Sequence, residues 1–422
     1  MNRYKIYVAF IVLGFLHQWK AGAQNILFEN ASIHTGNGRH IAEGFILVQD
    51  GKILELGAGD FAGDVSGYRR IDVEGRELYP GIIALNTQLG LKEIDAVRAT
   101  RDYDEVGSFN ANLRSIIAYN TDSEVVKTVR SAGVLMAQVT PRGGRISGRS
   151  TVVKLEAWNW EDAAIRMEDG VHLNWPNFYR ARGWWANPQS HKKNDKYKKA
   201  VDELLRYFAE AESYCQGSTM EKDLGLGGLC DVLGDEAALY IHVDDAVGMM
   251  DALDFCNRYG LDPIFYGARD ARKILELLKE KEVKLVLKRV KSLPSRIDGP
   301  LFSAYALPAD LYAAGIPFAI ADNGSWEQRN VIYQAAQAVA YGLPYEEAIR
   351  ALTLRPAEIT GVAEDRGSLE RGKHADLIIV DGDLLEIGSS MVKQAFFNGR
   401  ELDLSDKQKA LYEKYLDKYG LE

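Results

Sequence analysis

Two patterns of hydrophobic and polar positions divide the chain. Near its start, the segments NILFENASIHTG and GFILVQDGKILELGAG alternate apolar and polar residues around turn signals such as Asp50-Gly51. Alternation with a period of two is typical of strands with one buried face, so it predicts short antiparallel strands. The segments ADLIIVDGD and KQAFFNGREL, close to the other end, return to this pattern. Because neither end can bury a sheet face alone, we expect the two ends to pair into one small β-sandwich.

From Pro80 onward the pattern changes to apolar runs that alternate with amphipathic helical stretches. The strand-like runs are GIIAL, GVLMAQVT, TVVKLEAW, ALYIHV, DPIFYG, KLVLK and IPFAIAD, and the helical stretches include SEVVKTVRSAG, DDAVGMMDALDFCNRYG, ARDARKILELLKEKE and PADLYAAG. Strand–helix alternation implies parallel strands joined by crossover helices. Its length favours an α/β fold of the (β/α)8 TIM-like barrel type, with an open doubly wound sheet as the alternative.

The remaining segments complete the expected organisation. A charged helix near 190–215 breaks the strand–helix spacing and is interpreted as an insertion whose lysines form a solvated face. A polar helix or tail, capped at Ser405, ends the chain. The predicted boundaries are a signal peptide (1–23), the first part of the β-sandwich (24–79), the barrel (80–355), the second part of the β-sandwich (356–402) and the tail (403–422).

The N-terminus has the features of a targeting signal. Positive charge in MNRYK precedes the apolar run IYVAFIVLGFL, and Ala21-Gly22-Ala23 provides a small-residue cleavage site. The run is too short to span a bilayer as a stable helix. We therefore expect the mature protein to be periplasmic or secreted, without a membrane anchor after cleavage.

Composition narrows the class of partner. The chain has 422 residues and a formal net charge of −9, which is opposite to the balance usual in nucleic-acid-binding proteins, so no nucleic-acid partner is expected. The three cysteines, Cys215, Cys230 and Cys256, lack the spacing of a zinc cluster. Their pairing stays open, with small buried side chains as the simplest interpretation.

Polar residues at the predicted strand ends are the candidates for chemistry. In YPGIIALNTQLGL, Asn86 and Gln88 alternate along one strand, so both side chains could point into the barrel mouth. After the next strand, PRGGRISGRS carries Arg142, Arg145 and Arg149 among glycines. Arginine forks suit carboxylate or phosphate groups, so this loop is either a ligand site or an ordinary surface loop.

Several segments together resemble the amidohydrolase superfamily. ELYPGIIALNTQ is similar to its first barrel strand, AIADNG to its last, and ALTLRPAEITGVAEDRGSLERGKHADLIIVDGD to its exit into the β-sandwich. Some loops, such as QVTPRGGRISG, resemble a secreted subgroup related to imidazolonepropionase-like amidohydrolases. The resemblance implies a (β/α)8 barrel, a β-sandwich from both termini and hydrolysis of non-peptide carbon–nitrogen bonds with a divalent metal such as zinc.

The departures from the family pattern fall on its metal ligands. By position, the two first-strand histidines correspond to Asn86 and Gln88, and the strand-six histidine corresponds to Tyr266. The strand-five histidine and the strand-eight aspartate are matched by His242 and Asp322. The bridging ligand has no secure equivalent, with Lys154 a candidate by strand context alone. Amides are poor ligands for tetrahedral zinc, and a catalytic zinc site needs three good protein ligands, so we expect no metal cofactor.

Two functional hypotheses follow. In the first, the protein is a pseudoenzyme that binds a small nitrogen-containing molecule in the old pocket, or scaffolds a related amidohydrolase as a homo- or hetero-oligomer. Its binding residues would be Asn86, Gln88, Tyr266, Arg142, Arg145 and Arg149. In the second, it is an active hydrolase in which His242 and Asp322 act as a base and its orienting carboxylate, with no metal or with one atypical metal. The alternative for His242 and Asp322 is that both only hold the fold together.

Overall fold

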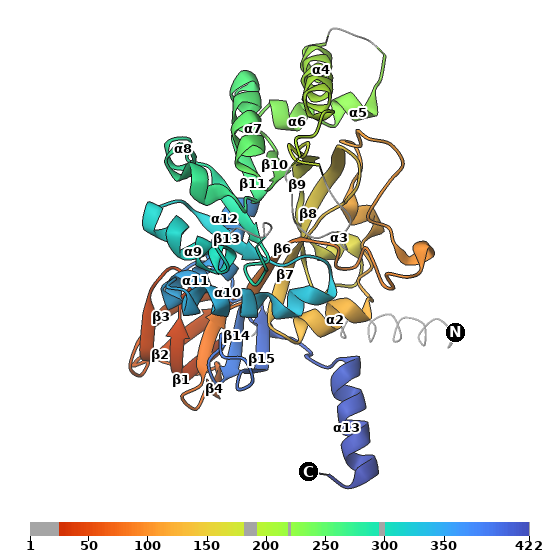
Figure 1. The fold of residues 1–422 in the computed structure, drawn as a ribbon. Coiled ribbons are helices and arrows are strands. Elements are labelled where there is room, and N and C mark those ends of the chain that lie inside the picture. Colours follow the sequence, from red (N-terminus) through yellow and green to blue (C-terminus); the bar gives the residue numbers. More distant parts are fainter. Residues whose placement is uncertain (1–24, 181–191, 218–220, 295–299, 422) are drawn as a thin grey trace, which may run out of the picture.

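The computed structural model describes residues 25–180, 192–217, 221–294 and 300–421. Two eight-stranded sheets organise the described chain. The sheet built from strands of both chain ends is called the second sheet below. In Figure 1, its red and blue strands lie at one end of the molecule, and α4 and α7 project at the other. The predicted signal peptide, residues 1–23, lies outside the described residues.

Strands from both ends of the chain form one continuous sheet. Its order is β16-β15-β14-β5-β1-β2-β3, with β4 paired to β1. The two ends meet where β14 runs antiparallel to β5 and Ile378 lies opposite Tyr79. The strands are β1 (Ile26–His34), β2 (His40–Gln49), β3 (Lys52–Ala58), β4 (Arg69–Asp72), β5 (Glu77–Pro80), β14 (Leu377–Asp381), β15 (Met391–Phe397) and β16 (Arg400–Glu401).

The other sheet curls into a nearly closed barrel. Its order runs from β13 back to β6 in chain sequence. Seven strands are mutually parallel, whereas β8 is antiparallel to both neighbours. The strands are β6 (Ile82–Thr87), β7 (Val134–Val139), β8 (Ile146–Lys154), β9 (Ala164–Asn174), β10 (Ala238–Val243), β11 (Pro263–Gly267), β12 (Lys284–Lys288) and β13 (Phe318–Ala321). The predicted barrel is confirmed, and the β7–β8 hairpin replaces one of the expected crossovers.

Helices cover the outside of the barrel and begin at recognisable caps. Ser123 and Asp245 accept backbone N–H bonds at the starts of α2 and α7, and Gly260, at φ +66°, ends α7 in the left-handed conformation. The covering helices are α2 (Glu124–Arg130), α3 (Trp160–Ala163), α7 (Ala246–Tyr259), α8 (Leu275–Glu280), α9 (Ser303–Ala314), α10 (Val331–Ala340), α11 (Tyr345–Leu352) and α12 (Leu354–Thr360). Short 3-10 turns lie at η1 (Arg98–Thr100), η2 (Ser115–Ala118), η3 (Ala271–Ile274) and η4 (Trp326–Asn330).

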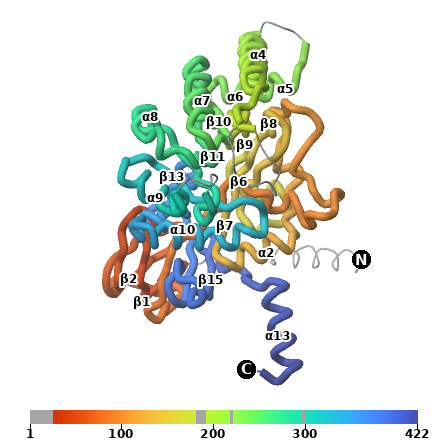
Figure 2. The backbone as a smooth tube through the Cα atoms, viewed as in Figure 1, coloured from red at the N-terminus to blue at the C-terminus, as the bar shows by residue number. Residues whose placement is uncertain are grey.

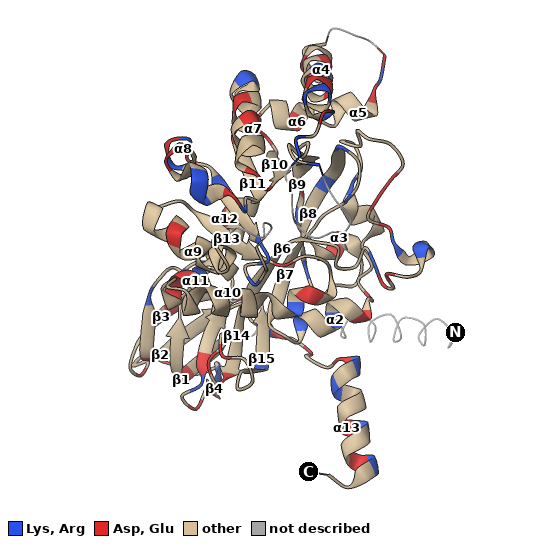
Figure 3. Ribbon diagram, in the orientation of Figure 1, with Lys and Arg blue, Asp and Glu red and all other residues tan. Residues whose placement is uncertain are grey.

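The predicted helical insertion is present between β9 and β10. It consists of α4 (Tyr197–Cys215), α5 (Leu224–Gly227) and α6 (Cys230–Leu233). A disulfide between Cys215 and Cys230 joins the end of α4 to the start of α6, and Cys256 is a buried free thiol. Figure 3 shows both charge signs distributed along α4, as expected for a solvated face.

The final helix, α13 (Lys407–Tyr419), extends away from the rest of the molecule, as the tube in Figure 2 shows. Its N-cap is Asp406, whose carboxylate accepts bonds from the backbone of Gln408 and Lys409. The predicted cap at Ser405 is therefore wrong by one residue, because the Ser405 hydroxyl donates to Asp403 instead. Within the described residues, no helix has the length and apolar character needed to cross a bilayer.

Candidate active site at the barrel mouth

Polar side chains gather at the carboxyl ends of the barrel strands. Asn86 lies near the end of β6, His242 near the end of β10 and Tyr266 near the end of β11, and Asp322 directly follows β13. The parallel register places His242 beside Tyr266, and the rings of these two residues are 4.8 Å apart. Parallel strand ends meet at one face of a barrel, so the four predicted positions belong to one mouth.

Arg142 extends into this mouth from the β7–β8 hairpin loop. Its Nη2 donates to the backbone oxygen of Asn86 at 3.2 Å. The Gln88 amide is assigned with its oxygen toward the guanidinium, where it accepts from Nε at 2.5 Å and from Nη2 at 2.8 Å. The positive charge of Arg142 also contributes to lowering the pKa of His172 and of His242. The guanidinium therefore lies among the strand ends that, by family position, would carry the metal ligands.

His242 hydrogen-bonds a second histidine, His172, which is not among the site residues predicted from the sequence. Its Nε2 lies 2.9 Å from Nδ1 of His172, whose Nε2 lies 2.8 Å from Ser150 Oγ. His172 is on β9, where it is buried. Burial, as the main cause, holds the pKa of both rings well below the ordinary value. Both rings are thus neutral near pH 7. The alternation in VHLN, with Val171 and Leu173 facing away from His172, was the sequence signal that could have placed it on a strand.

Asp322 is held by partners other than His242. Its carboxylate accepts from the backbone N of Asn323 and from Nε2 of Gln334, each at 2.7 Å. Arg289 Nε lies 3.5 Å away. Burial raises the pKa of Asp322. Because His242 bonds His172 and Asp322 bonds Gln334, the expected base-and-carboxylate pair is not formed, and the catalytic roles of these two residues stay predictions.

Asn86 is strained and unsatisfied. Its φ is +52°, in the left-handed region that asparagine tolerates better than most residues. The residue is 1% exposed, yet neither atom of its amide has a well-formed hydrogen bond among the described residues. The nearby Tyr266 hydroxyl donates to Asn323 Oδ1 at 3.3 Å, and burial raises the pKa of Tyr266. Buried polar groups are nearly always paired, so the Asn86 amide is an exception that needs an explanation.

The other two arginines of the loop segment have structural partners. Arg149 lies within β8 rather than in the loop, and it bonds Glu168, Asp231 and two backbone carbonyls. Arg145 donates to the backbone oxygen of Asn174 at 2.7 Å. Of the three predicted binding arginines, only Arg142 reaches the mouth residues. Lys154 is also placed elsewhere, because it lies at the far end of β8 and pairs with Asp162.

A cavity of about 180 Å³ opens beside the mouth. Arg269, Lys288, Arg289, Asp244 and Asn323 contribute its polar lining. The lining thus has three cationic side chains and one carboxylate, that of Asp244. Lys288 pairs with Asp244 at 2.9 Å. A larger cavity, of about 460 Å³, borders the beginnings of β10, β11 and β12 and therefore lies at the opposite end of the barrel.

The donor set at the mouth does not match a catalytic zinc centre. Zinc takes imidazole, thiolate or carboxylate ligands in a tetrahedral arrangement. Here the end of β6 and the residue after it present the amides of Asn86 and Gln88. Tyr266 lies on β11, and Arg142 directs N–H donors and a positive charge at Gln88 and the backbone of Asn86. A cation held there would be repelled by the guanidinium.

Comparisons with known proteins find similarity to amidohydrolases. Residues 301–402 match the model of the Amidohydrolase family. The curated protein Amidohydrolase tasK of Hapsidospora irregularis is 23% identical over 389 residues, covering 83% of this chain and 39% of its own. An imidazolonepropionase of Thermoplasma volcanium is 36% identical over 94 residues, covering 20% of this chain and 23% of its own. The chain thus spans well under two thirds of these relatives.

Solved structures show the same fold at low sequence identity. The crystal structure of an amidohydrolase from Thermotoga maritima has a TM-score of 0.76 at 20% identity, covering 90% of this chain and 99% of its own. A structure of molinate hydrolase has a TM-score of 0.55 at 16% identity, and the match covers 91% of this chain and 95% of the chain of that structure. Taken together, the matches support membership of the amidohydrolase superfamily.

The buried histidine pair makes folding stability depend on pH. The pKa of His172 and of His242 is lowered from 6.5, so below pH 6.5 the unfolded chain binds protons that the folded chain does not. We expect the free energy of unfolding to fall with decreasing pH below 6.5, by up to about 1.4 kcal/mol per pH unit for each histidine. Burial raises the pKa of Asp169 and of Asp322. The folded chain therefore binds protons at these two carboxyls more readily than the unfolded chain, and their contribution to the free energy of unfolding rises as the pH falls toward the ordinary pKa of aspartate.

Urea denaturation at successive pH values between 7.5 and 5 would measure this dependence. His242→Asn, which removes one of the two rings, should reduce the slope. A wild-type stability that stays flat through this range would contradict the interpretation of the pair as neutral.

Proposed function

We propose that the protein is a metal-independent member of its superfamily that binds a small nitrogen-containing molecule with an anionic group at the barrel mouth. The observation that carries the proposal is the position of Arg142, whose guanidinium bonds Asn86 and Gln88 where the family would hold a metal. A guanidinium offers fixed positive charge and a planar set of N–H donors, which suits a carboxylate.

The surrounding groups favour the same class of ligand. Lys288 and Arg289 line the adjacent cavity and remain 33% and 55% exposed, so both can turn toward a bound anion. The unpaired Asn86 amide supplies one donor and one acceptor, as an amide or a nitrogen ring requires. Two curated relatives carry the name imidazolonepropionase, and small nitrogen compounds that bear an acid are therefore the first class to test.

Catalysis by the buried histidine is the alternative function, and its pKa argues against it. A general base works best when its pKa is close to the working pH. Burial lowers the pKa of His242 well below that range, so the ring accepts a proton from water reluctantly. A hydrolytic activity that His242→Ala and Asp322→Asn each remove, in folded protein, would support the alternative hydrolase instead.

We further propose a periplasmic or secreted location. The Cys215–Cys230 disulfide supports it, because such bonds persist mainly in oxidising compartments. An assembly with a related amidohydrolase subunit stays a prediction.

Ligand binding is expected to depend on Arg142. In a calorimetric comparison of small N-acyl amino acids and cyclic amides with their uncharged carboxamide analogues, the carboxylates should bind and the analogues should not. Arg142→Gln should weaken binding of any carboxylate found by about 10- to 100-fold, since a charge-assisted hydrogen bond contributes about 1.5–3 kcal/mol.

Arg70→Gln provides the control, because Arg70 pairs with Glu29 on the second sheet, away from the mouth. Equal binding of a carboxylate and its carboxamide, or binding unchanged by Arg142→Gln, would refute the proposal. Circular dichroism of each variant would separate loss of binding from loss of fold.

A further inference from the structure

A second cluster of metal-ligating side chains lies on the second sheet, away from the barrel mouth. His34 ends β1 and His40 begins β2, and these two residues lie directly opposite one another in the antiparallel register. Glu77, on the neighbouring strand β5, is paired with Ser32 of β1. Three adjacent strands thus present two imidazoles and a carboxylate together, with potential ligand atoms all within 4.8 Å of one another.

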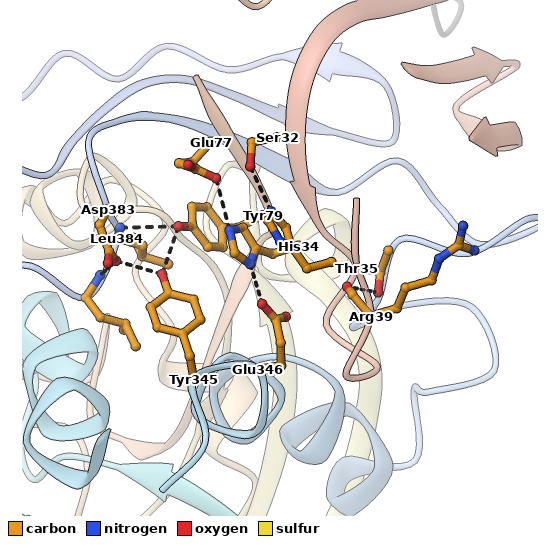
Figure 4. Close-up of polar contacts among 12 residues, drawn as sticks. Ser32, His34, Thr35, Arg39, Glu77, Tyr79, Tyr345, Glu346, Asp383 and Leu384 are labelled. Carbon is orange, nitrogen blue, oxygen red and sulfur yellow. Dashed lines mark hydrogen bonds and ion pairs between the residues drawn. The ribbon is translucent and has the colours of Figure 1, made fainter. Parts of the chain in front are cut away.

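His34 is held between two carboxylates, as Figure 4 shows. Its Nδ1 lies 2.6 Å from Oε1 of Glu346 on α11, and its Nε2 lies 3.0 Å from Oε2 of Glu77. A neutral imidazole has one N–H and one lone pair, and carboxylates only accept hydrogen bonds. If Nδ1 donates to Glu346, the Nε2 lone pair faces the oxygen of Glu77. Two acceptor atoms cannot bond each other directly, so a proton or a metal ion must lie between them.

The orientation of His34 is fixed from several directions. Its ring stacks on Tyr79 with centroids 4.4 Å apart and on His40 with centroids 4.3 Å apart. Tyr79 is itself anchored through its hydroxyl to Tyr345, which bonds Asp383 at 2.6 Å. The buried ring of His34 therefore directs Nε2 at Glu77 without freedom to turn away. A carboxylate that bonds the far nitrogen of a histidine is the usual support of a metal-bound imidazole.

We propose that His34 Nε2, Glu77 and His40 bind one divalent transition ion of the zinc class, with Glu346 as the positioning residue. Two imidazoles and one carboxylate form a ligand set typical of zinc sites that keep a fourth position for water. His40 is exposed and its Nε2 bonds Ser32 Oγ at 2.8 Å. Because the His40 ring is stacked nearly parallel on the His34 ring, ligation requires His40 to leave this stack and its bond to Ser32, and to turn a nitrogen toward Glu77; zinc–nitrogen bonds are about 2.0–2.1 Å long. The exposed side of the site leaves the fourth position open to solvent.

The charge of the cluster also favours a cation. Glu77 and Glu346 place two carboxylates around His34, and their side chains are 31% and 23% exposed. A bound divalent ion neutralises both charges and replaces the proton that the His34–Glu77 contact otherwise needs. The location, between β1, β2, β5 and α11, is separate from the mouth formed by the barrel strands.

Metal binding to tag-free, EDTA-treated protein tests the proposal directly. We expect one equivalent of zinc by calorimetry and elemental analysis, and a d–d absorption band on adding cobalt(II). His40→Ala and Glu77→Gln should each abolish the band and weaken zinc binding at least 100-fold. Glu346→Gln, which alters only the support of His34, should keep the one-to-one stoichiometry and weaken binding about 10- to 100-fold.

Glu43→Gln is the matched control, because Glu43 is an exposed carboxylate on β2, the same strand as His40. Both Glu43→Gln and His40→Ala change exposed side chains, so the fold should persist in each. Absence of zinc and cobalt binding in the wild-type chain would overturn the proposal and assign a proton to the His34–Glu77 contact. Zinc binding that survives His40→Ala would also overturn the proposal. Zinc binding that is lost in His242→Asn would place the ion in the barrel mouth, and it would contradict the proposed function as well.

Discussion

Replacing Arg149 by methionine is expected to lower the free energy of unfolding by about 3 kcal/mol. The Arg149 side chain is 9% exposed and bonds Glu168 at 2.7 Å and Asp231 at 2.6 Å through Nη1. It also donates to the backbone carbonyls of Ala111 and Gly228. Breaking a buried ion pair by removing one partner costs about 3–5 kcal/mol. The lower end of this energy range applies because the side chains of Glu168 and Asp231 are 25% and 42% exposed, so water can hydrate both carboxylates once the arginine is removed.

Chemical denaturation of the variant would measure this loss. Arg70→Met is the control, since Arg70 forms a two-bond pair with Glu29 but is 62% exposed, and an exposed pair contributes about 0–1 kcal/mol. A loss below 1 kcal/mol for Arg149→Met would show that the network contributes little.

The barrel was predictable because its signal is distributed over many residues. Apolar runs such as ALYIHV and KLVLK are short, β-rich and separated by helical stretches, and each adds to the same prediction. The antiparallel direction of β8 was not predictable in this way. TVVKLEAW has the composition of a buried strand in either direction. Its direction is set by the short connection of residues 140–145 between β7 and β8, because a parallel connection needs a longer crossover.

The mouth was predicted position by position, whereas its bonding was not. Asn86, Tyr266, His242 and Asp322 all lie at strand ends as expected. Which of them bond one another depends on side chains from distant elements, such as His172 on β9 and Gln334 on α10. Neither residue has a recognisable motif around it. The cross-strand pair His34 and His40 was missed for a similar reason, because the carboxylates that complete the cluster come from β5 and from α11.

The role of Arg142 illustrates how a loop can change a site more than a strand does. Asn86 lies near the end of β6, and Gln88 directly follows that strand. The guanidinium of Arg142, from the β7–β8 loop, bonds both residues. The amides and the arginine are chemically matched, since an amide oxygen and a backbone carbonyl accept what a guanidinium donates. The two amide residues and the arginine of the loop therefore form one arrangement.

Replacing Asp376 by asparagine is expected to lower the free energy of unfolding by about 3–5 kcal/mol, because it leaves the buried charge of Arg366 unpaired. Asp376 belongs to the exit segment GSLERGKHADL, which carries the strongest family resemblance. Its side chain is 3% exposed, that of Arg366 is 8% exposed, and the two are in direct contact. Asp376 also accepts the backbone N–H of Asn398 at 2.8 Å, which ties the chain leaving the barrel to the turn after β15.

Equilibrium unfolding in guanidinium chloride would test this expectation against Asp381→Asn. Asp381 ends β14, five residues further on, and pairs with Lys393 at 3.4 Å while 55% exposed, so its replacement should cost less than about 1 kcal/mol. The double variant Arg366→Met with Asp376→Asn should recover part of the loss, because removing both partners leaves no unpaired charge. Equal destabilisation by Asp376→Asn and Asp381→Asn would show that burial does not increase the contribution of this ion pair to the free energy of unfolding. The contribution of Asp376 to stability would then come from its bond with the backbone of Asn398.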